Sequence, residues 1–161
     1  MRILDIVEAT TVDGPGFRNS VYLAGCTHHC DGCHNPQSWD PAGGYDITPQ
    51  ELAGKLIEMG LDVTFSGGDP MLQAAEVAVT AEILKAAGLS VWVYTGFRYE
   101  ELNAHADMNR VLDFADVVVD GRFVLALRNT SLLFKGSSNQ RLIDVKATRR
   151  SGKVVEWESS F

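Results

Sequence analysis

Residues 25–36 read Gly-Cys-Thr-His-His-Cys-Asp-Gly-Cys-His-Asn-Pro and contain every cysteine of the 161-residue chain, Cys26, Cys30 and Cys33. A C-x3-C-x2-C loop gathers three soft thiolates, which are ligands that suit an iron–sulfur cluster or a zinc ion. A four-iron cluster held by three cysteines keeps one iron free of protein ligands, and that iron can bind a small molecule. We therefore take the three cysteines as candidate metal ligands.

Two other interpretations of the cysteines stay open at this point. A structural zinc site would add His34, although adjacent Cys33 and His34 make an awkward pair for one tetrahedron and zinc knuckles usually draw ligands from a second loop. A disulfide is disfavoured because the number of cysteines is odd and they are closely spaced. The neighbouring His28 and His29 are expected to face solvent rather than to act as ligands.

Composition and charge narrow the class of protein. A chain of 161 residues with 45% hydrophobic content predicts a single domain over residues 1–161. The formal charge of −7 disfavours nucleic acid as a partner, because phosphate contacts need clustered Lys and Arg. The absence of both a signal peptide and an apolar run of about 18 residues predicts a cytoplasmic protein without a membrane partner. Unpaired thiolates also favour a reducing compartment.

Short Val-rich runs alternate with helical patterns along most of the chain, and this alternation predicts an α/β fold with mostly parallel strands. The expected helices include one that begins after Thr48, with Pro49 at its first position and Glu51 completing a capping box. Expected strands cover 19–24, 62–66, 90–94 and 116–119, and shorter apolar runs follow at 132–134, 141–145 and 154–157. Expected helices cover 49–59, 70–87 and 98–114, and a long loop covers 25–47.

Informative residues follow each of the four expected strands. In parallel α/β architectures the active site lies where the carboxyl ends of the strands meet. The cysteine loop, Ser66–Pro70, Thr95-Gly96 and Asp120-Gly121 are therefore expected to converge at one edge. This convergence favours an enzyme over a zinc-stabilised binding module.

The C-x3-C-x2-C spacing resembles the signature of radical S-adenosylmethionine (SAM) enzymes. In that family three cysteines hold a [4Fe-4S] cluster whose open iron chelates the methionine part of SAM, and the reduced cluster cleaves SAM to a 5′-deoxyadenosyl radical. The resemblance implies an incomplete radical SAM β/α barrel, because a full barrel needs more strands than this chain supplies. Beyond the cluster and SAM, it implies no further catalytic residue.

The resemblance also assigns SAM-binding residues in the segment Ser66-Gly-Gly-Asp-Pro70. Gly67, Gly68 and Asp69 match the glycine-rich segment whose backbone receives the SAM amino group, with Asp69 in place of the Glu of many relatives. Taken alone, paired glycines after a strand indicate only a tight turn.

Further SAM contacts are implied around the third cysteine. Gly32, Cys33 and His34 would lie beside the adenine, with the His34 ring available for stacking. Gly32 departs from the pattern, because many relatives have an aromatic residue at that position. The resemblance leaves Asp120, at a strand end, to meet either SAM or the incoming substrate.

Two more segments resemble one branch of the family, the activases of glycyl-radical enzymes. Asp13-Gly-Pro-Gly-Phe-Arg18 resembles a D-G-P-G-x-R segment of these activases and is expected to shape the mouth of the site. Gly136-Ser-Ser-Asn-Gln-Arg141 resembles an element of the activases of anaerobic ribonucleoside-triphosphate reductases, although composition alone supports only a turn. With Val93-Tyr-Thr-Gly96 and Val119-Asp-Gly-Arg-Phe123, the resemblance covers nearly the whole chain.

This branch implies a reaction on a glycine Cα–H of a large glycyl-radical reductase subunit. The two proteins would meet around residues 134–141, and the electron would come from flavodoxin or another small redox protein. Two alternatives remain: a radical SAM enzyme acting on a small molecule, such as the deazapurine synthase of queuosine biosynthesis, and a zinc-stabilised binding module. The segment Gly136–Arg141 argues against the first alternative.

Overall fold

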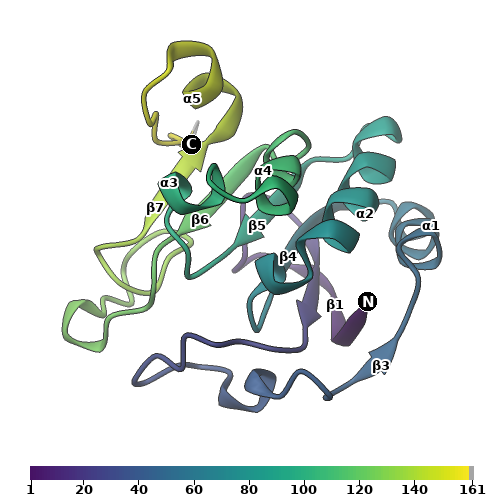
Figure 1. Cartoon of the computed structure of the whole chain (residues 1–161), viewed down its shortest axis with the longest axis horizontal. Helices are drawn as coiled ribbons and strands as arrows, with labels where there is room; N and C mark the ends of the chain where they lie inside the picture. The colour runs from purple at the N-terminus through teal and green to yellow at the C-terminus, as the bar shows by residue number, and fades with distance from the viewer. Residues whose placement is uncertain (160–161) are drawn as a thin grey trace.

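The Val-rich runs form the centre of a seven-stranded sheet in the computed structural model, which describes residues 1–159 (Figure 1). The order across the sheet is β3-β1-β2-β4-β5-β6-β7, with β2, β4, β5 and β6 parallel to their neighbours in this central group. The strands are β1 (Arg2–Thr10), β2 (Arg18–Leu23), β3 (Tyr45–Asp46), β4 (Asp62–Gly67), β5 (Val91–Tyr94), β6 (Val117–Asp120) and β7 (Arg141–Asp144). The prediction of a mixed α/β fold with mostly parallel strands is confirmed.

One row of apolar side chains crosses the sheet and fixes its register. Val21 pairs with Phe65, Phe65 with Val93, and Val93 with Val118, which pairs in turn with Ile143 of β7. All five side chains are fully buried. Because a slip of one residue would turn such a row to the opposite face, this row specifies the pairing of five strands.

The outer strands run against their neighbours. The long strand β1 pairs antiparallel with both β2 and β3, and β7 pairs antiparallel with β6. The sequence did not predict β1, because most of its side chains are exposed or half-exposed and the strand has no apolar run. Within residues 1–159 the sheet stays open, since β3 and β7 form its two edges.

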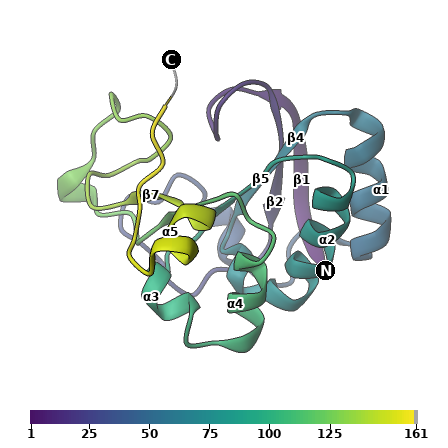
Figure 2. The same cartoon turned by 90° about the horizontal axis from the view of Figure 1, so that it is seen from above.

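Helices α1, α2 and α4 form a layer beside the sheet (Figures 1 and 2). The helices are α1 (Pro49–Met59), α2 (Ala74–Ala86), α3 (Tyr99–Leu102), α4 (Ala106–Leu112) and α5 (Val145–Ser151). Helix α1 begins at the predicted capping box, in which the Thr48 hydroxyl accepts from the Glu51 amide, and it ends at Gly60 in the left-handed region (φ 81°). No helix in residues 1–159 has the length and apolar content needed to cross a membrane.

Several predicted boundaries are wrong. The expected helix at 98–114 is two short helices, α3 and α4, and the expected helix at 70–87 begins as a 3₁₀ turn at Pro70–Gln73. The expected loop at 25–47 contains strand β3 and a 3₁₀ turn at Pro36–Trp39. Residues 132–134 are not a strand, and the run at 154–157 supplies only an isolated bridge from Glu156 to Ile143.

Candidate functional site

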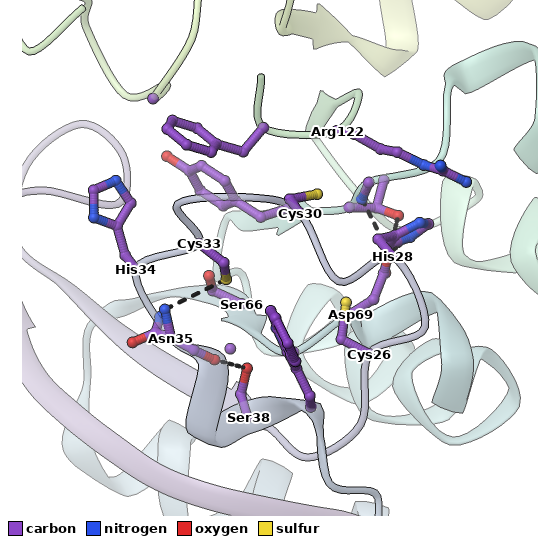
Figure 3. A pocket seen from close by; sticks show the side chains of 18 of the residues that line it. Cys26, His28, Cys30, Cys33, His34, Asn35, Ser38, Ser66, Asp69 and Arg122 are labelled. Carbon is purple, nitrogen blue, oxygen red and sulfur yellow. Dashed lines mark hydrogen bonds and ion pairs between the residues drawn. The ribbon is translucent and has the colours of Figure 1, made fainter. Parts of the chain in front are cut away.

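The carboxyl ends of β2, β4, β5 and β6 surround one cavity of about 350 Å³ (Figure 3). All four loops that were expected to converge contribute to its lining. The three cysteines, His34, Gly67, Gly68, Asp69, Thr95 and Gly121 are among the lining residues. The predicted convergence at one edge of the sheet is therefore confirmed by the geometry.

Backbone hydrogen bonds anchor the start of the cysteine loop and form a turn near its end. Its first residues are held by backbone hydrogen bonds from Gly25 N to Ser38 O (2.7 Å) and from Cys26 N to Trp39 O (3.3 Å). Near its end, Cys33 N donates to Cys30 O (3.1 Å). The loop thus closes on itself and presents its cysteines to the cavity.

The chemical state of the thiols suits metal binding. All three cysteines are free and half-buried within the described chain. Burial raises the pKa of the Cys26 thiol, so binding a metal there requires the release of a proton. The Cys33 Sγ already accepts a hydrogen bond from Asn35 N (3.4 Å), the kind of interaction that tunes a ligating sulfur.

These residues fit an iron–sulfur cluster. Within residues 1–159 no three His, Cys, Asp or Glu side chains converge on one metal ion, and a four-iron cluster does not require this because each thiolate binds a different iron. The Trp39 indole Nε1, on a residue that lines the cavity, is buried with no hydrogen-bond partner among the described residues. The cavity therefore offers both sulfur ligands and an unused donor.

The paired glycines allow the chain to pass close to the cysteine loop. A Cβ on Gly67 would lie 2.4 Å from Leu23 N, and one on Gly68 would lie 2.2 Å from Gly25 O. The Gly68 amide donates to Leu23 O (2.8 Å), and the Asp69 amide donates to Gly25 O (2.8 Å). The glycines thus hold the turn after β4 against the residues that lead into the cysteine loop.

Asp69 is buried and already bound to several donors. Its carboxylate accepts from Thr95 Oγ1 (2.9 Å), Gly96 N (3.0 Å) and Met71 N (3.0 Å), and it lies 2.6 Å from His28 Nε2. The expectation that His28 faces solvent is wrong, because its side chain is only 4% exposed. No local pattern indicates this burial, since the partner of His28 lies 41 residues away.

Of the other histidines of the loop, His29 is exposed as expected and stacks on Trp39 with 4.4 Å between ring centroids. His34 lines the cavity, and its ring lies 5.4 Å from the ring of Phe123. Gly32 lies outside the residues that line this cavity, and a Cβ there would point at Leu125 Cδ1, 2.8 Å away.

Asp120 also lies outside the lining of the cavity. It is 1% exposed and accepts from Tyr99 N (2.8 Å) and from the Arg141 guanidinium through Nε (3.0 Å) and Nη2 (2.5 Å). The hydrogen bond to Asp120 raises the pKa of Arg141 above its ordinary value. The following residues, Gly121 and Arg122, do line the cavity, so Asp120 anchors the loop that reaches it.

The segment Asp13–Arg18 contributes one residue to the cavity. Asp13 lines it and accepts from Ser20 Oγ and Tyr22 Oη, both at 2.8 Å. Burial, reinforced by this hydrogen bond, raises the pKa of Tyr22. Arg18 instead lies buried below the site, where it donates to Thr64 Oγ1 (2.9 Å).

The segment Gly136–Arg141 braces the loop after β6. Gln140 donates to Gly121 O (3.0 Å) and accepts from Gly136 N (2.9 Å), while Asn139 donates to Arg122 O (2.8 Å). Gly136 and Gln140 both line the cavity. The structure thus gives this polar segment a defined place in the wall of the site.

Other residues of the lining were not predicted, among them Tyr22, Tyr94 and Phe123. Tyr22 and Tyr94 lie near the ends of β2 and β5, just before loops that were expected to form the site. This position in the sequence could have predicted that they line the cavity. Phe123 follows β6 in an irregular segment, and its contact with His34 depends on tertiary packing alone.

Comparisons with known proteins agree with this site. The family model of the 4Fe-4S single cluster domain matches residues 12–143. The anaerobic ribonucleoside-triphosphate reductase-activating protein of Salmonella typhimurium is 35% identical over 87% of this chain and 96% of its own length. The protein of that name from Escherichia coli is 35% identical over 80% and 89%. The pyruvate formate-lyase-activating enzyme of Clostridium pasteurianum is 37% identical over 74% of this chain and 55% of its own length.

Proposed function

We propose that this chain, which has a 4Fe-4S single cluster domain and belongs to the family of anaerobic ribonucleoside-triphosphate reductase-activating proteins, installs a glycyl radical on such a reductase. The observation that carries the proposal is a single cavity lined by three free cysteines and by the turn that contains the paired glycines. The family assignment favours this function over a zinc-stabilised binding module and over an enzyme acting on a small molecule.

In this proposal Cys26, Cys30 and Cys33 hold a [4Fe-4S] cluster, and the turn at Gly67 and Gly68 receives SAM. When bound, the cluster and SAM supply a 5′-deoxyadenosyl radical that can remove a hydrogen atom from a glycine Cα. The contribution of the chain is to bind both groups in one cavity, to orient them and to limit the access of water.

The adenine is proposed to lie beside His34 and Phe123. These two rings contact each other in the wall of the cavity, with 5.4 Å between their centroids and 60° between their planes. Aromatic side chains at this spacing offer large apolar contacts to a flat base. The unpaired Trp39 indole is a further donor for a polar group of the ligand.

The open sheet is proposed to be a partial radical SAM barrel whose open side admits the partner. A second hollow, continuous with the cavity, runs between Thr11–Asp13 and Thr130–Gly136 and shares Asp13, His34, Tyr94 and Gly136 with it. Val12 and Leu133 flank this hollow and are 68% and 46% exposed. Exposed apolar side chains at the mouth of a site favour a protein substrate, whose glycine-bearing loop would enter here.

The electron is proposed to come from flavodoxin or a similar small redox protein. We place the reaction in the cytoplasm because three unpaired thiols need a reducing compartment. Residues 134–141 are proposed to contact the reductase, since Gly136 and Gln140 already form part of the cavity wall.

The test is electron paramagnetic resonance of the anaerobically reconstituted chain, reduced with dithionite and recorded with and without SAM. We expect a reduced four-iron signal that changes on adding SAM, and a glycyl radical when an anaerobic ribonucleoside-triphosphate reductase is then added. Cys30→Ser should abolish both signals, whereas Thr27→Ser, an exposed change in the same loop, should preserve them. A colourless chain that retains one zinc ion would contradict the proposal.

A further inference from the structure

His28 occupies a site that is built around its ring. It is the middle residue between Cys26 and Cys30, yet its side chain is 4% exposed, and its ring packs edge-on against Phe97 with 4.7 Å between centroids. A Cβ on Gly96 would lie 2.5 Å from His28 Cδ2, so only glycine leaves room for the ring at that point. The loop thus sends one side chain inward beneath its cysteines.

The inward end of His28 meets Asp69 (Figure 3). Nε2 lies 2.6 Å from Oδ2, and because a carboxylate only accepts, the imidazole is the donor. Asp69 lies in the glycine-rich turn after β4 and is 1% exposed. This contact is a direct side-chain link between the cysteine loop and the turn proposed to bind SAM.

The carboxylate of Asp69 has little capacity left for a ligand. Four donors from the described chain reach it: Met71 N and Thr95 Oγ1 at Oδ1, and His28 Nε2 and Gly96 N at Oδ2, with Thr95 Oγ1 also within 3.0 Å of Oδ2. A carboxylate offers about four lone-pair sites. The geometry therefore favours Asp69 as a fixed anchor rather than as a free acceptor for an incoming ammonium group.

We propose that His28 is a positioning residue that, through Asp69, fixes the segment Cys26–Cys30 on the glycine-rich turn and so couples retention of the cluster to binding of SAM. The proposal rests on the proposed function for the identity of the two ligands. Its physical basis is preorganisation: the middle of a three-residue spacer is held in place, so two thiols are ordered before the metal arrives. Without the anchor, metal binding must supply the ordering of that segment.

The first experiment measures how fast an anaerobically reconstituted chain loses its cluster to a chelator. Removing a residue that orients metal ligands typically weakens a site by about 10- to 100-fold, so His28→Leu should lose the cluster at least about 10-fold faster. His28→Gln keeps an N–H donor near Nε2 and should recover most of the retention. Thr27→Leu is the matched control, because it places the same side chain on an exposed position of the same spacer, and it should stay within about twofold of wild type.

A double-mutant cycle tests whether the effect passes through Asp69. Asp69→Asn should accelerate loss of the cluster, and combining it with His28→Leu should add little to the more severe single change, because both break the same contact. Effects that simply multiply would overturn the proposal. So would wild-type retention in His28→Leu, or a His28→Gln variant no better than His28→Leu.

A second measurement separates positioning from a purely structural role. The SAM concentration that half-converts the electron paramagnetic resonance signal should rise in His28→Leu and return toward wild type in His28→Gln, with cluster content matched between samples.

Thermal unfolding of the cluster-free chains shows which variants fold. If His28→Leu does not fold, the rates of cluster loss of His28→Gln and Asp69→Asn are compared instead, and His28→Gln should keep its cluster longer than Asp69→Asn. Cluster loss is measured without SAM or reductase. The rate of cluster loss therefore tests the role of His28 even if the chain fails to activate the reductase. A wild-type chain that takes up no cluster would overturn both proposals.

Discussion

Asp69 and Asp120 are two buried carboxylates near the ends of parallel strands, but they bind different donors. Asp69 lies two residues beyond the end of β4 and Asp120 is the last residue of β6, and each is 1% exposed. The donors to Asp69 include His28 from the cysteine loop and Thr95 from the cavity wall, whereas Asp120 receives the guanidinium of Arg141 from an edge strand. Burial and position at a strand end are thus shared, and the donors distinguish a carboxylate in the site from one that fastens the sheet.

The charge of the donors sharpens this difference. Arg141 is a permanent cation, and its pKa is raised by the hydrogen bond to Asp120, so Asp120 always faces a positive charge. Asp69 is held by uncharged amide and hydroxyl donors and by an imidazole, and the donors from His28, Thr95 and Gly96 belong to residues that line the cavity. Disrupting the contacts of Asp120 should therefore change mainly the stability of the fold. Disrupting the contacts of Asp69 should change mainly the binding of ligands.

The largest effect is expected from Arg141→Met. This change leaves the charge of Asp120 buried without its cation, and breaking a buried ion pair in this way typically lowers the free energy of unfolding by about 3–5 kcal/mol. Urea unfolding of the cluster-free chain, followed by circular dichroism, measures the loss. The rate of cluster loss from the folded chain should stay near that of wild type.

The control is the double variant Arg141→Met with Asp120→Asn, which removes the buried charge and should recover part of the lost stability. If Arg141→Met instead releases the cluster as fast as His28→Leu without destabilising the fold, the two anchors are equivalent and the comparison is wrong.

The sequence predicted the groups at the site better than the contacts between them. The three cysteines were recognised because their spacing carries chemistry, and the paired glycines because they match the glycine-rich segment of a known family. Their convergence followed from the parallel order of the strands. The link between His28 and Asp69 was missed, since no local pattern reports a pairing across 41 residues. The pairing of Asp120 with Arg141 of β7 also spans distant residues, so the sequence alone left Asp120 as a candidate contact of the ligand.

The errors in the fold have comparable causes. Strand β1 was missed because its exposed face removes the apolar run that marks a buried strand. Helix α5 is only seven residues long, and it begins where Asp144 accepts from Ala147 N directly after β7, so the local pattern read as a continuing strand. Short elements of this kind are specified by packing against the rest of the sheet rather than by periodicity.

An intermediate effect is expected from Thr95→Val, which weakens the Asp69 anchor from the other side. The Thr95 hydroxyl donates to Asp69 and accepts from Phe97 N (3.1 Å), so valine of similar shape leaves buried polar groups unpaired. We expect a loss of about 2 kcal/mol in the free energy of unfolding, measured by urea unfolding, together with faster cluster loss.

Thr95→Ser is the matched control, because it restores the hydroxyl while removing the methyl group, and it should recover most of both losses. Stability lost without any change in cluster retention would mean that Thr95 supports the end of β5 alone and that Asp69 does not depend on it.

The smallest effect concerns Glu100, the outer partner of Arg141. The hydrogen bond from Arg141 lowers the pKa of Glu100, and the side chain is 57% exposed, so solvent limits its contribution to less than about 1 kcal/mol. A carboxyl whose pKa is lowered by folding stabilises the fold above its unfolded pKa of about 4.3, and this contribution disappears as the pH falls through the lower folded value.

The difference in the free energy of unfolding between wild type and Glu100→Gln should therefore be present at about pH 6 and shrink toward zero by about pH 3. Urea unfolding of the cluster-free chains at both pH values measures it, and the other carboxyls cancel because they titrate in both chains. High salt should shrink the difference at about pH 6, since the pair is exposed. A difference that grows on acidification would mean that the pKa of Glu100 is raised by folding. Arg141 would then serve Asp120 alone, which would make the contrast with the many donors of Asp69 sharper still.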